Sequence, residues 1–186
     1  GLTILLNLGI TIAQFIGGIL SGSIALLSDA AHNFSDVISL LVSYTANRLA
    51  KKRATSDKTF GYKRAEIIAA FINAISLVLL SIWLIIESVQ RLLTPEAVNE
   101  ITVIYLSLVA IAGNGLSVYL LYRQTDKNLN IKSAYVHLLS DLMASVVVLI
   151  GGISIYFYGW YWIDPLLGVI ISIYLIYLGD DLLKES

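Results

Sequence analysis

The segment ISLVLLSIWLII, residues 75–86, contains no charged side chain and shows no alternation of apolar and polar residues. Strands of a membrane barrel alternate with a period of two residues, so this segment is typical of a helix. The surrounding stretch, residues 65–92, is longer than the roughly 20 residues that a helix needs to cross a bilayer core. The segment therefore predicts a membrane-spanning helix.

The composition of the whole chain agrees with a membrane protein. Of 186 residues, 58% are hydrophobic and 13% are charged, whereas soluble domains have roughly 45–50% and about 25%. A net charge of −1 gives no indication of a nucleic-acid partner. The chain has no cysteine, which excludes a disulfide framework and a thiolate metal site. A single small soluble domain is the weaker interpretation.

Six spans are predicted, and turn signals separate several of them. The spans are residues 2–20, 24–49, 65–92, 101–122, 131–158 and 161–178. Ser21-Gly22-Ser23, Thr94-Pro95-Glu96 and Gly159 mark breaks between them. The predicted fold is an all-α bundle of six transmembrane helices, and residues 1–186 are expected to form one transmembrane domain.

Basic residues indicate the orientation of the spans. Seven lie in or beside the loop after the second span, three lie around the loop after the fourth span, and Lys184 follows the sixth, which makes eleven of the 12. Only Arg91 lies on the opposite side. Because cytoplasmic loops are enriched in Lys and Arg, we expect this side and both termini to be cytoplasmic. In a bacterium, the location would be the inner membrane. The aromatic residues between 156 and 162 are typical of the opposite interface.

The chain has two histidines, and each precedes an aspartate by four residues inside a predicted span. Four residues are about one helical turn, so His32 shares a face with Asp36, and His137 shares one with Asp141. Ionisable residues at the centre of a membrane helix cost about 2.5–3.5 kcal/mol each, so they are found where partners receive them. Imidazole and carboxylate are ligands of divalent transition metals, and a tetrahedral site takes four. The pattern predicts one metal site between the second and fifth spans.

Simpler interpretations remain open at this point. Each pair could be a helix-stabilising contact within its own span, worth a few tenths of a kcal/mol. The site could also hold a purely structural zinc. Asp29, one turn before His32, could be an outer hydrogen-bond partner of that histidine or could attract the incoming ion. Alternatively it forms a helix cap with Ser28. The other polar residues within the spans are expected to form interhelical hydrogen bonds or line a cavity: Asn7, Gln14, Asn73, Glu87 and Asn114. Ser133, Ser140 and Ser145 lie on broadly the same side of the fifth span as its ligand pair.

Four motifs in this order resemble the membrane domain of the cation diffusion facilitators, a family of zinc-transporting antiporters. They are SDAAHNFSD (residues 28–36), FGYKRAE (60–66), HLLSD (137–141) and DP (164–165). The resemblance covers all six predicted spans. It implies a proton-coupled zinc efflux transporter that works by alternating access, with zinc as the transported substrate, and not an enzyme.

The resemblance also implies residues and partners. The transport site would consist of His32, Asp36, His137 and Asp141, a ligand set similar to that of zinc-preferring members. Protons, the lipid bilayer and a second copy of the chain in a homodimer are the implied partners, and no organic cofactor is expected. Many members carry a cytoplasmic C-terminal domain, and the chain stops about where that domain would begin. It also starts directly in apolar sequence without Met, as a segment of a longer protein would.

Two other functions use the same residues. A zinc-dependent intramembrane hydrolase would need three protein ligands, an open coordination position and a base, and Asp29 is the available base. The His-Glu-x-x-His motif of many zinc hydrolases is absent from the sequence. A membrane scaffold stapled by zinc would need the four ligands and no transport.

Overall fold

The computed structural model describes residues 2–50, 63–122 and 129–185, and every regular element within these ranges is an α-helix. The helices are α1 (Leu2–Ser21), α2 (Ile24–Ala50), α3 (Lys63–Leu93), α4 (Glu100–Tyr122), α5 (Leu129–Tyr158) and α6 (Ile163–Glu185). The prediction of an all-α fold is confirmed. The basic loop residues between 51 and 62 and between 123 and 128 lie outside the described residues.

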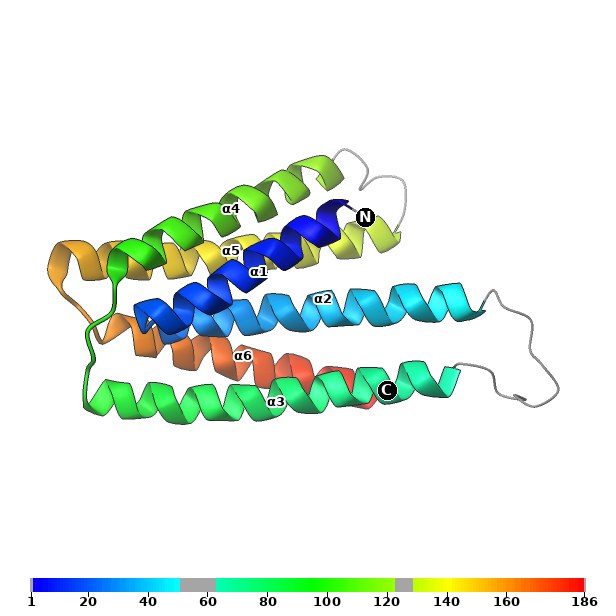
Figure 1. The fold of residues 1–186 in the computed structure, drawn as a ribbon, viewed down its shortest axis with the longest axis horizontal. Helices are drawn as coiled ribbons and strands as arrows, with labels where there is room; N and C mark the ends of the chain where they lie inside the picture. Colours follow the sequence, from blue (N-terminus) through cyan, green and yellow to red (C-terminus); the bar gives the residue numbers. More distant parts are fainter. Residues whose placement is uncertain (1, 51–62, 123–128, 186) are drawn as a thin grey trace.

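The helices run up and down in one bundle (Figure 1). α3 packs mainly against α6, and α4 packs mainly against α5. α2 lies between these pairs and contacts α1, α3 and α6, whereas its contact with α5 is sparse. α1 begins and α6 ends at the end of the bundle where α2 and α4 end (Figure 1).

Four helical segments among the described residues are long and apolar enough to cross a membrane. They are Ile67–Leu93, Glu100–Leu120, Tyr135–Tyr158 and Ile163–Asp181. A further apolar stretch, Asn7–Ser21, is shorter. α2 has a lower hydropathy because a polar stripe runs along it. The chain is a multi-pass membrane protein, and a count of six crossings stays a prediction.

The predicted spans begin and end within two residues of the observed helices, except that α6 continues beyond the sixth span. That span was predicted at residues 161–178, the apolar segment of α6 is Ile163–Asp181, and the helix itself runs from Ile163 to Glu185. Gly179, Asp180 and Asp181 resemble a stop signal, yet Lys184 pairs with Asp180 one turn earlier and supports continued helix.

A tight turn joins α1 to α2 and fastens the start of α2 to its neighbours. Gly22 has a φ of 71°, a left-handed conformation that glycine adopts at little cost. Ser23 caps α2, since its hydroxyl accepts a hydrogen bond from the Leu26 amide at 3.0 Å. The carboxylate of Asp164, in α6, accepts hydrogen bonds from the Ser23 hydroxyl and, at 2.7 Å, from the Ile24 amide. Arg91, at the end of α3, donates to the Gly22 carbonyl.

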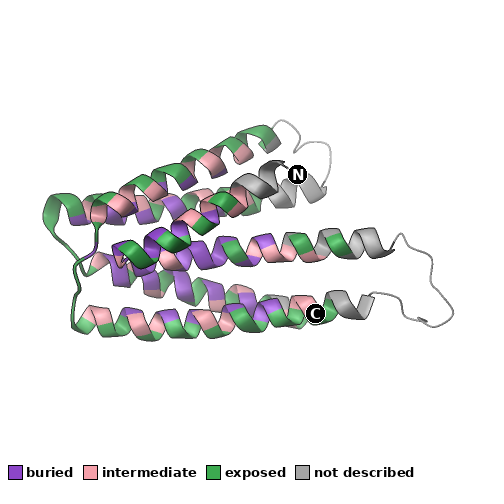
Figure 2. Ribbon diagram, in the orientation of Figure 1, coloured by how far each residue is buried: buried purple, intermediate pink, exposed green. Residues whose placement is uncertain are grey.

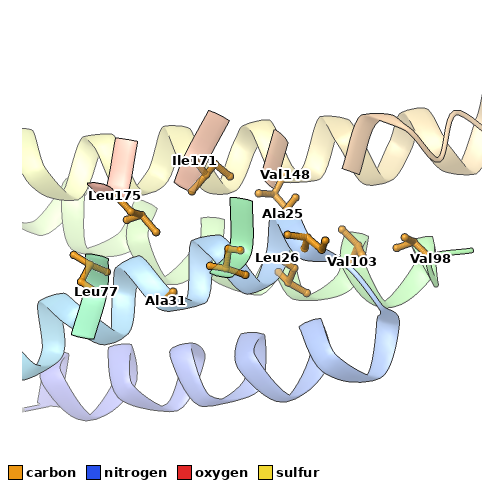
Figure 3. Packing of buried hydrophobic residues seen from close by; sticks show 11 residues of the cluster. Ala25, Leu26, Ala31, Leu77, Val98, Val103, Val148, Ile171 and Leu175 are labelled. Carbon is orange, nitrogen blue, oxygen red and sulfur yellow. The ribbon is translucent and has the colours of Figure 1, made fainter. Parts of the chain in front are cut away.

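The apolar core lies between α2, α3, α4, α5 and α6 (Figure 3). Leu26 and Ala31 of α2 meet Leu77 of α3, Val148 of α5 and Leu175 of α6 in this cluster. The buried residues of α2 concentrate in its first half (Figure 2). The same half contains the polar stripe, so these polar side chains are held inside the bundle.

Candidate metal centre

The four predicted ligands come together in the structure. His32 and Asp36 project from α2, and His137 and Asp141 project from α5. One ligand atom from each residue lies within 4.8 Å of the others. Helices α2 and α5, which pack sparsely elsewhere, therefore meet through four metal-ligating side chains.

The shortest contacts cross between the two helices. Nε2 of His32 lies 3.1 Å from Oδ1 of Asp141, and Nε2 of His137 lies 3.3 Å from Oδ2 of Asp36. Within α2 the His32–Asp36 distance is 3.6 Å, and within α5 the His137–Asp141 distance is 3.9 Å. The interpretation that each pair serves only its own helix is therefore wrong.

The two cross-helix pairs differ in burial. The side chains of His32 and Asp141, here called the deep pair, are 4% and 2% exposed. Those of Asp36 and His137, the shallow pair, are 15% and 45% exposed. Asp36 lies one turn farther along α2 than His32, and His137 lies one turn earlier in α5 than Asp141. The shallow pair is therefore closer than the deep pair to the end of the bundle where both termini lie.

The spacing of the four atoms suits a small tetrahedral ion. Zinc bonds to imidazole nitrogen and carboxylate oxygen are about 2.0–2.2 Å long, which puts neighbouring ligand atoms about 3.3–3.5 Å apart. The four histidine–aspartate separations, 3.1 to 3.9 Å, bracket this value. Two carboxylates also supply the charge that balances a divalent cation. The arrangement can bind such an ion after small side-chain movements.

Neighbouring side chains support the cluster from α3 and α6. The ring of Tyr174 meets the His32 ring edge-on, with centroids 6.0 Å apart. Asn73 of α3 donates to the hydroxyls of Ser35 and Ser39, both at 3.1 Å, on either side of Asp36 in α2. The hydrogen bond of Asn73 confirms its predicted interhelical role. Tyr174 was not anticipated, because nothing in the sequence distinguishes it from the other tyrosines.

Asp29 has different partners from those expected. Its Oδ2 accepts hydrogen bonds from Nε2 of Gln14, at 2.6 Å, and from the hydroxyl of Ser145, at 3.2 Å. No hydrogen bond joins Asp29 to His32 in the described structure. The cap interpretation is wrong, because α2 already begins at Ile24 and Ser23 is its cap. An outer-partner role for Asp29 stays a prediction.

The serines of the fifth span have different hydrogen-bond partners. Ser145 reaches Asp29, whereas the exposed Ser140 donates to the Val136 carbonyl of its own helix, at 3.1 Å. The side chain of Ser133 lies outside the described residues.

Gln14 forms the interhelical hydrogen bonds predicted for it, and Glu87 pairs with Arg91 within α3.

Comparison with known proteins identifies relatives over almost the whole chain. The family model of the cation efflux transmembrane domain matches residues 2–186. The cadmium, cobalt and zinc/H(+)-K(+) antiporter of Bacillus subtilis is 42% identical over 180 residues, which are 96% of this chain and 58% of the relative. The zinc transporter ZitB of Escherichia coli is 36% identical over 179 residues, 96% of this chain and 57% of the relative.

A third relative, the metal cation efflux system protein CzcD of Cupriavidus metallidurans, is 36% identical over 175 residues, 94% of this chain and 55% of the relative. The chain thus spans less than three fifths of the length of these relatives.

Proposed function

The chain belongs to the cation efflux transmembrane domain family, a family of metal cation transporters rather than enzymes, and we propose that it is the transport domain of a proton-coupled zinc exporter. Family membership confirms the resemblance to the cation diffusion facilitators. We further propose that all six helices cross the membrane, that residues 1–186 act as one domain, and that both termini are cytoplasmic. A homodimer is proposed from the resemblance alone.

One observation carries the proposal: two imidazoles and two carboxylates from different helices meet inside the bundle, with ligand atoms within 4.8 Å. Such a ligand set suits zinc better than a hard ion such as magnesium, because imidazole favours the later transition metals. The names of relatives include zinc, cadmium and cobalt. We propose zinc as the main substrate, with cadmium and cobalt as the competing ions.

The geometry suggests how an ion reaches the site. His137 is the most exposed ligand and lies toward the end of the bundle that we assign to the cytoplasm. A zinc ion arriving from that side contacts the shallow pair first and then completes its coordination with the deep pair. Movement of α5 relative to α2 would then open the site to the opposite side, as in alternating access about a site within the membrane.

Protons compete with zinc for the same atoms. Metal ligands must be deprotonated to bind, so zinc binding releases protons and protons displace zinc. Free imidazole titrates near pH 6.5, which makes the two histidines the proposed exchangers. The two carboxylates balance the charge of the ion. Exchange of zinc for protons follows from this competition when the two faces of the site open in turn.

The hydrolase and the scaffold would use the same four ligands, but no further observation favours either function. A hydrolase needs an open coordination position and a base that activates water. Asp29, the candidate base, is engaged by Gln14 and Ser145, and the chain belongs to a transport family. A zinc-stapled scaffold would bind metal without transporting it, and one experiment distinguishes such a scaffold from a transporter.

The test uses the full chain reconstituted in liposomes that contain a zinc-sensitive dye. We expect zinc uptake into the lumen when the lumen is acidic relative to the outside, and little uptake when the gradient is collapsed. Parallel experiments with potassium in place of sodium test for a second exchanged ion, because one relative's name includes K(+). Zinc binding with no flux under any gradient would contradict transport and favour the scaffold.

A further inference from the structure

A second polar cluster lies directly beside the ligands and links three helices. It consists of Gln14 on α1, Asp29 and Asn33 on α2, and Ser145 on α5, all of them buried. Asn33 donates to Oε1 of Gln14 at 3.1 Å, and Gln14 donates to Oδ2 of Asp29 at 2.6 Å. Ser145 donates to the same Oδ2 at 3.2 Å. The cluster is a continuous hydrogen-bonded chain.

Both donors to Asp29 use one carboxylate oxygen. The other oxygen, Oδ1, is buried and has no hydrogen-bond partner in the described part of the chain. The same is true of Nδ1 of His32, the ring nitrogen that faces away from the other ligands. A buried donor or acceptor without a partner is unusual in a folded protein and calls for an explanation.

The positions of Asp29 and His32 on α2 explain why Oδ1 and Nδ1 are both buried without a partner. His32 follows Asp29 by three residues, and side chains of an α-helix lean toward its N-terminus. The imidazole of His32 therefore leans over the turn that contains Asp29. Because Nε2 of His32 faces the acidic ligands, Nε2 is the atom that would bind the ion. A neutral imidazole that binds through Nε2 carries its proton on Nδ1, so Nδ1 is a donor.

Gln14 decides which carboxylate oxygen is available to that donor. Asn33 engages the carbonyl oxygen of the Gln14 amide, which leaves the amide nitrogen directed at Oδ2 of Asp29. With Ser145 on the same atom, Oδ1 remains as the acceptor. The two donors to Oδ2 therefore lie on α1 and α5, and they determine which oxygen of Asp29, on α2, stays available.

We propose that Gln14 is a positioning residue that acts through Asp29 on His32. By holding Oδ2 it directs Oδ1 toward Nδ1–H of His32, and so fixes the ring with Nε2 toward the ion. The inference rests on the proposed metal site and adds α1 to the helices that determine its affinity. Second partners of metal-bound histidines typically contribute 10- to 100-fold to metal affinity.

The test measures zinc dissociation constants of the purified full chain. Gln14→Leu and Asp29→Leu keep the side-chain volume but remove the polar contacts, and we expect about 10-fold and 10- to 100-fold weaker binding. Asp29→Asn keeps one side-chain oxygen, for which Gln14, Ser145 and Nδ1–H of His32 then compete, so it should weaken binding clearly less than Asp29→Leu. Ser28→Ala is the matched control, since it removes a buried hydrogen bond from the same turn of α2, to Ser172 of α6.

A double-mutant cycle separates positioning from general support of the fold. His32→Asp retains a ligand oxygen but has no Nδ1–H, so Gln14→Leu and Asp29→Leu should have little further effect in that background. Equal losses in both backgrounds, or equally weak binding by Asp29→Asn and Asp29→Leu, would overturn the inference. If His32→Asp binds too weakly to measure, the comparison of the two Asp29 variants decides. Zinc binding that is insensitive to His32→Ala would instead overturn the proposed site itself.

Discussion

The deep pair and the shallow pair contain the same chemical groups in different surroundings. In each pair a histidine of one helix faces an aspartate of the other at 3.1 to 3.3 Å. His32 and Asp141 are enclosed, whereas His137 is 45% exposed. From this difference we propose a division of roles, in which the enclosed pair would hold the ion in a fixed geometry and the exposed pair would admit it.

Loss of a deep ligand should have the largest effect. His32→Ala or Asp141→Ala removes one of four ligands, and we expect zinc flux to disappear and zinc binding to weaken at least 100-fold. The ligand left behind is a buried polar group without its partner, so the unfolding free energy should fall by about 3–5 kcal/mol. Flux in liposomes and thermal unfolding in detergent measure the two effects. Unchanged flux in either variant would contradict the site.

Replacement of the whole deep pair should separate stability from transport. In the double variant His32→Leu with Asp141→Leu, no unpaired polar ligand remains, and apolar replacement of a buried ion pair is often neutral or stabilising. We expect its unfolding free energy to return to within about 1 kcal/mol of wild type, while flux stays absent. If the double variant is as unstable as the single variants, then the unpaired buried ligand is not the cause of their lower unfolding free energy.

The shallow pair should control which ion binds. His137→Asp makes the ligand set richer in oxygen, which favours harder ions. We expect the preference for zinc over manganese to fall by about tenfold in competition binding, with the fold unchanged. An unaltered preference would show that the identity of this ligand does not select the metal.

The pH dependence of zinc binding should distinguish the contributions of the two histidines. Each protonated histidine must lose its proton before zinc binds. The dissociation constant of wild type should then rise up to about 100-fold per pH unit on acidification, and that of His137→Ala about tenfold. Titration calorimetry at several pH values gives these slopes. Identical slopes would exclude His137 as an exchanger.

The smallest effect is expected far from the ligands, where Asp164 of α6 accepts hydrogen bonds from the start of α2. Asp164→Asn weakens the hydrogen bonds to Ser23 and Ile24 and removes a charge from a helix N-terminus. We expect a loss of about 1–2 kcal/mol in unfolding free energy, with zinc affinity within twofold of wild type. A large loss of zinc affinity would mean that this end of α2 also sets the geometry of the pairs.

The sequence was sufficient to predict what depends on local spacing. A four-residue separation places His32 with Asp36 and His137 with Asp141 on single helix faces, and the absence of other histidines leaves one way to build a two-histidine site. The turn at Gly22 followed from its neighbours in the same way. These features depend on residues a few positions apart, so they can be recognised without the fold.

The sequence was not sufficient for features that depend on how helices pack. The axial position of α5 relative to α2 determines three of these features. They are the crossed pairing, the greater exposure of His137 and the hydrogen bond from Ser145 to Asp29. The hydrogen bond from the Ile24 amide to Asp164 joins residues 140 positions apart, and no local pattern predicts it. The extension of α6 was missed because acidic residues after Gly179 resembled a loop.

The crossed arrangement ties the coordination of an ion to the register between α2 and α5. Each helix presents its histidine and aspartate one turn apart, in opposite order along the bundle. Sliding α5 by one turn, about 5.4 Å, would set His32 level with His137, or Asp36 level with Asp141, and like groups would face each other. Neither arrangement brings all four residues to one ion, so an axial shift of this size would release an ion bound at the proposed site without moving either helix out of the bundle.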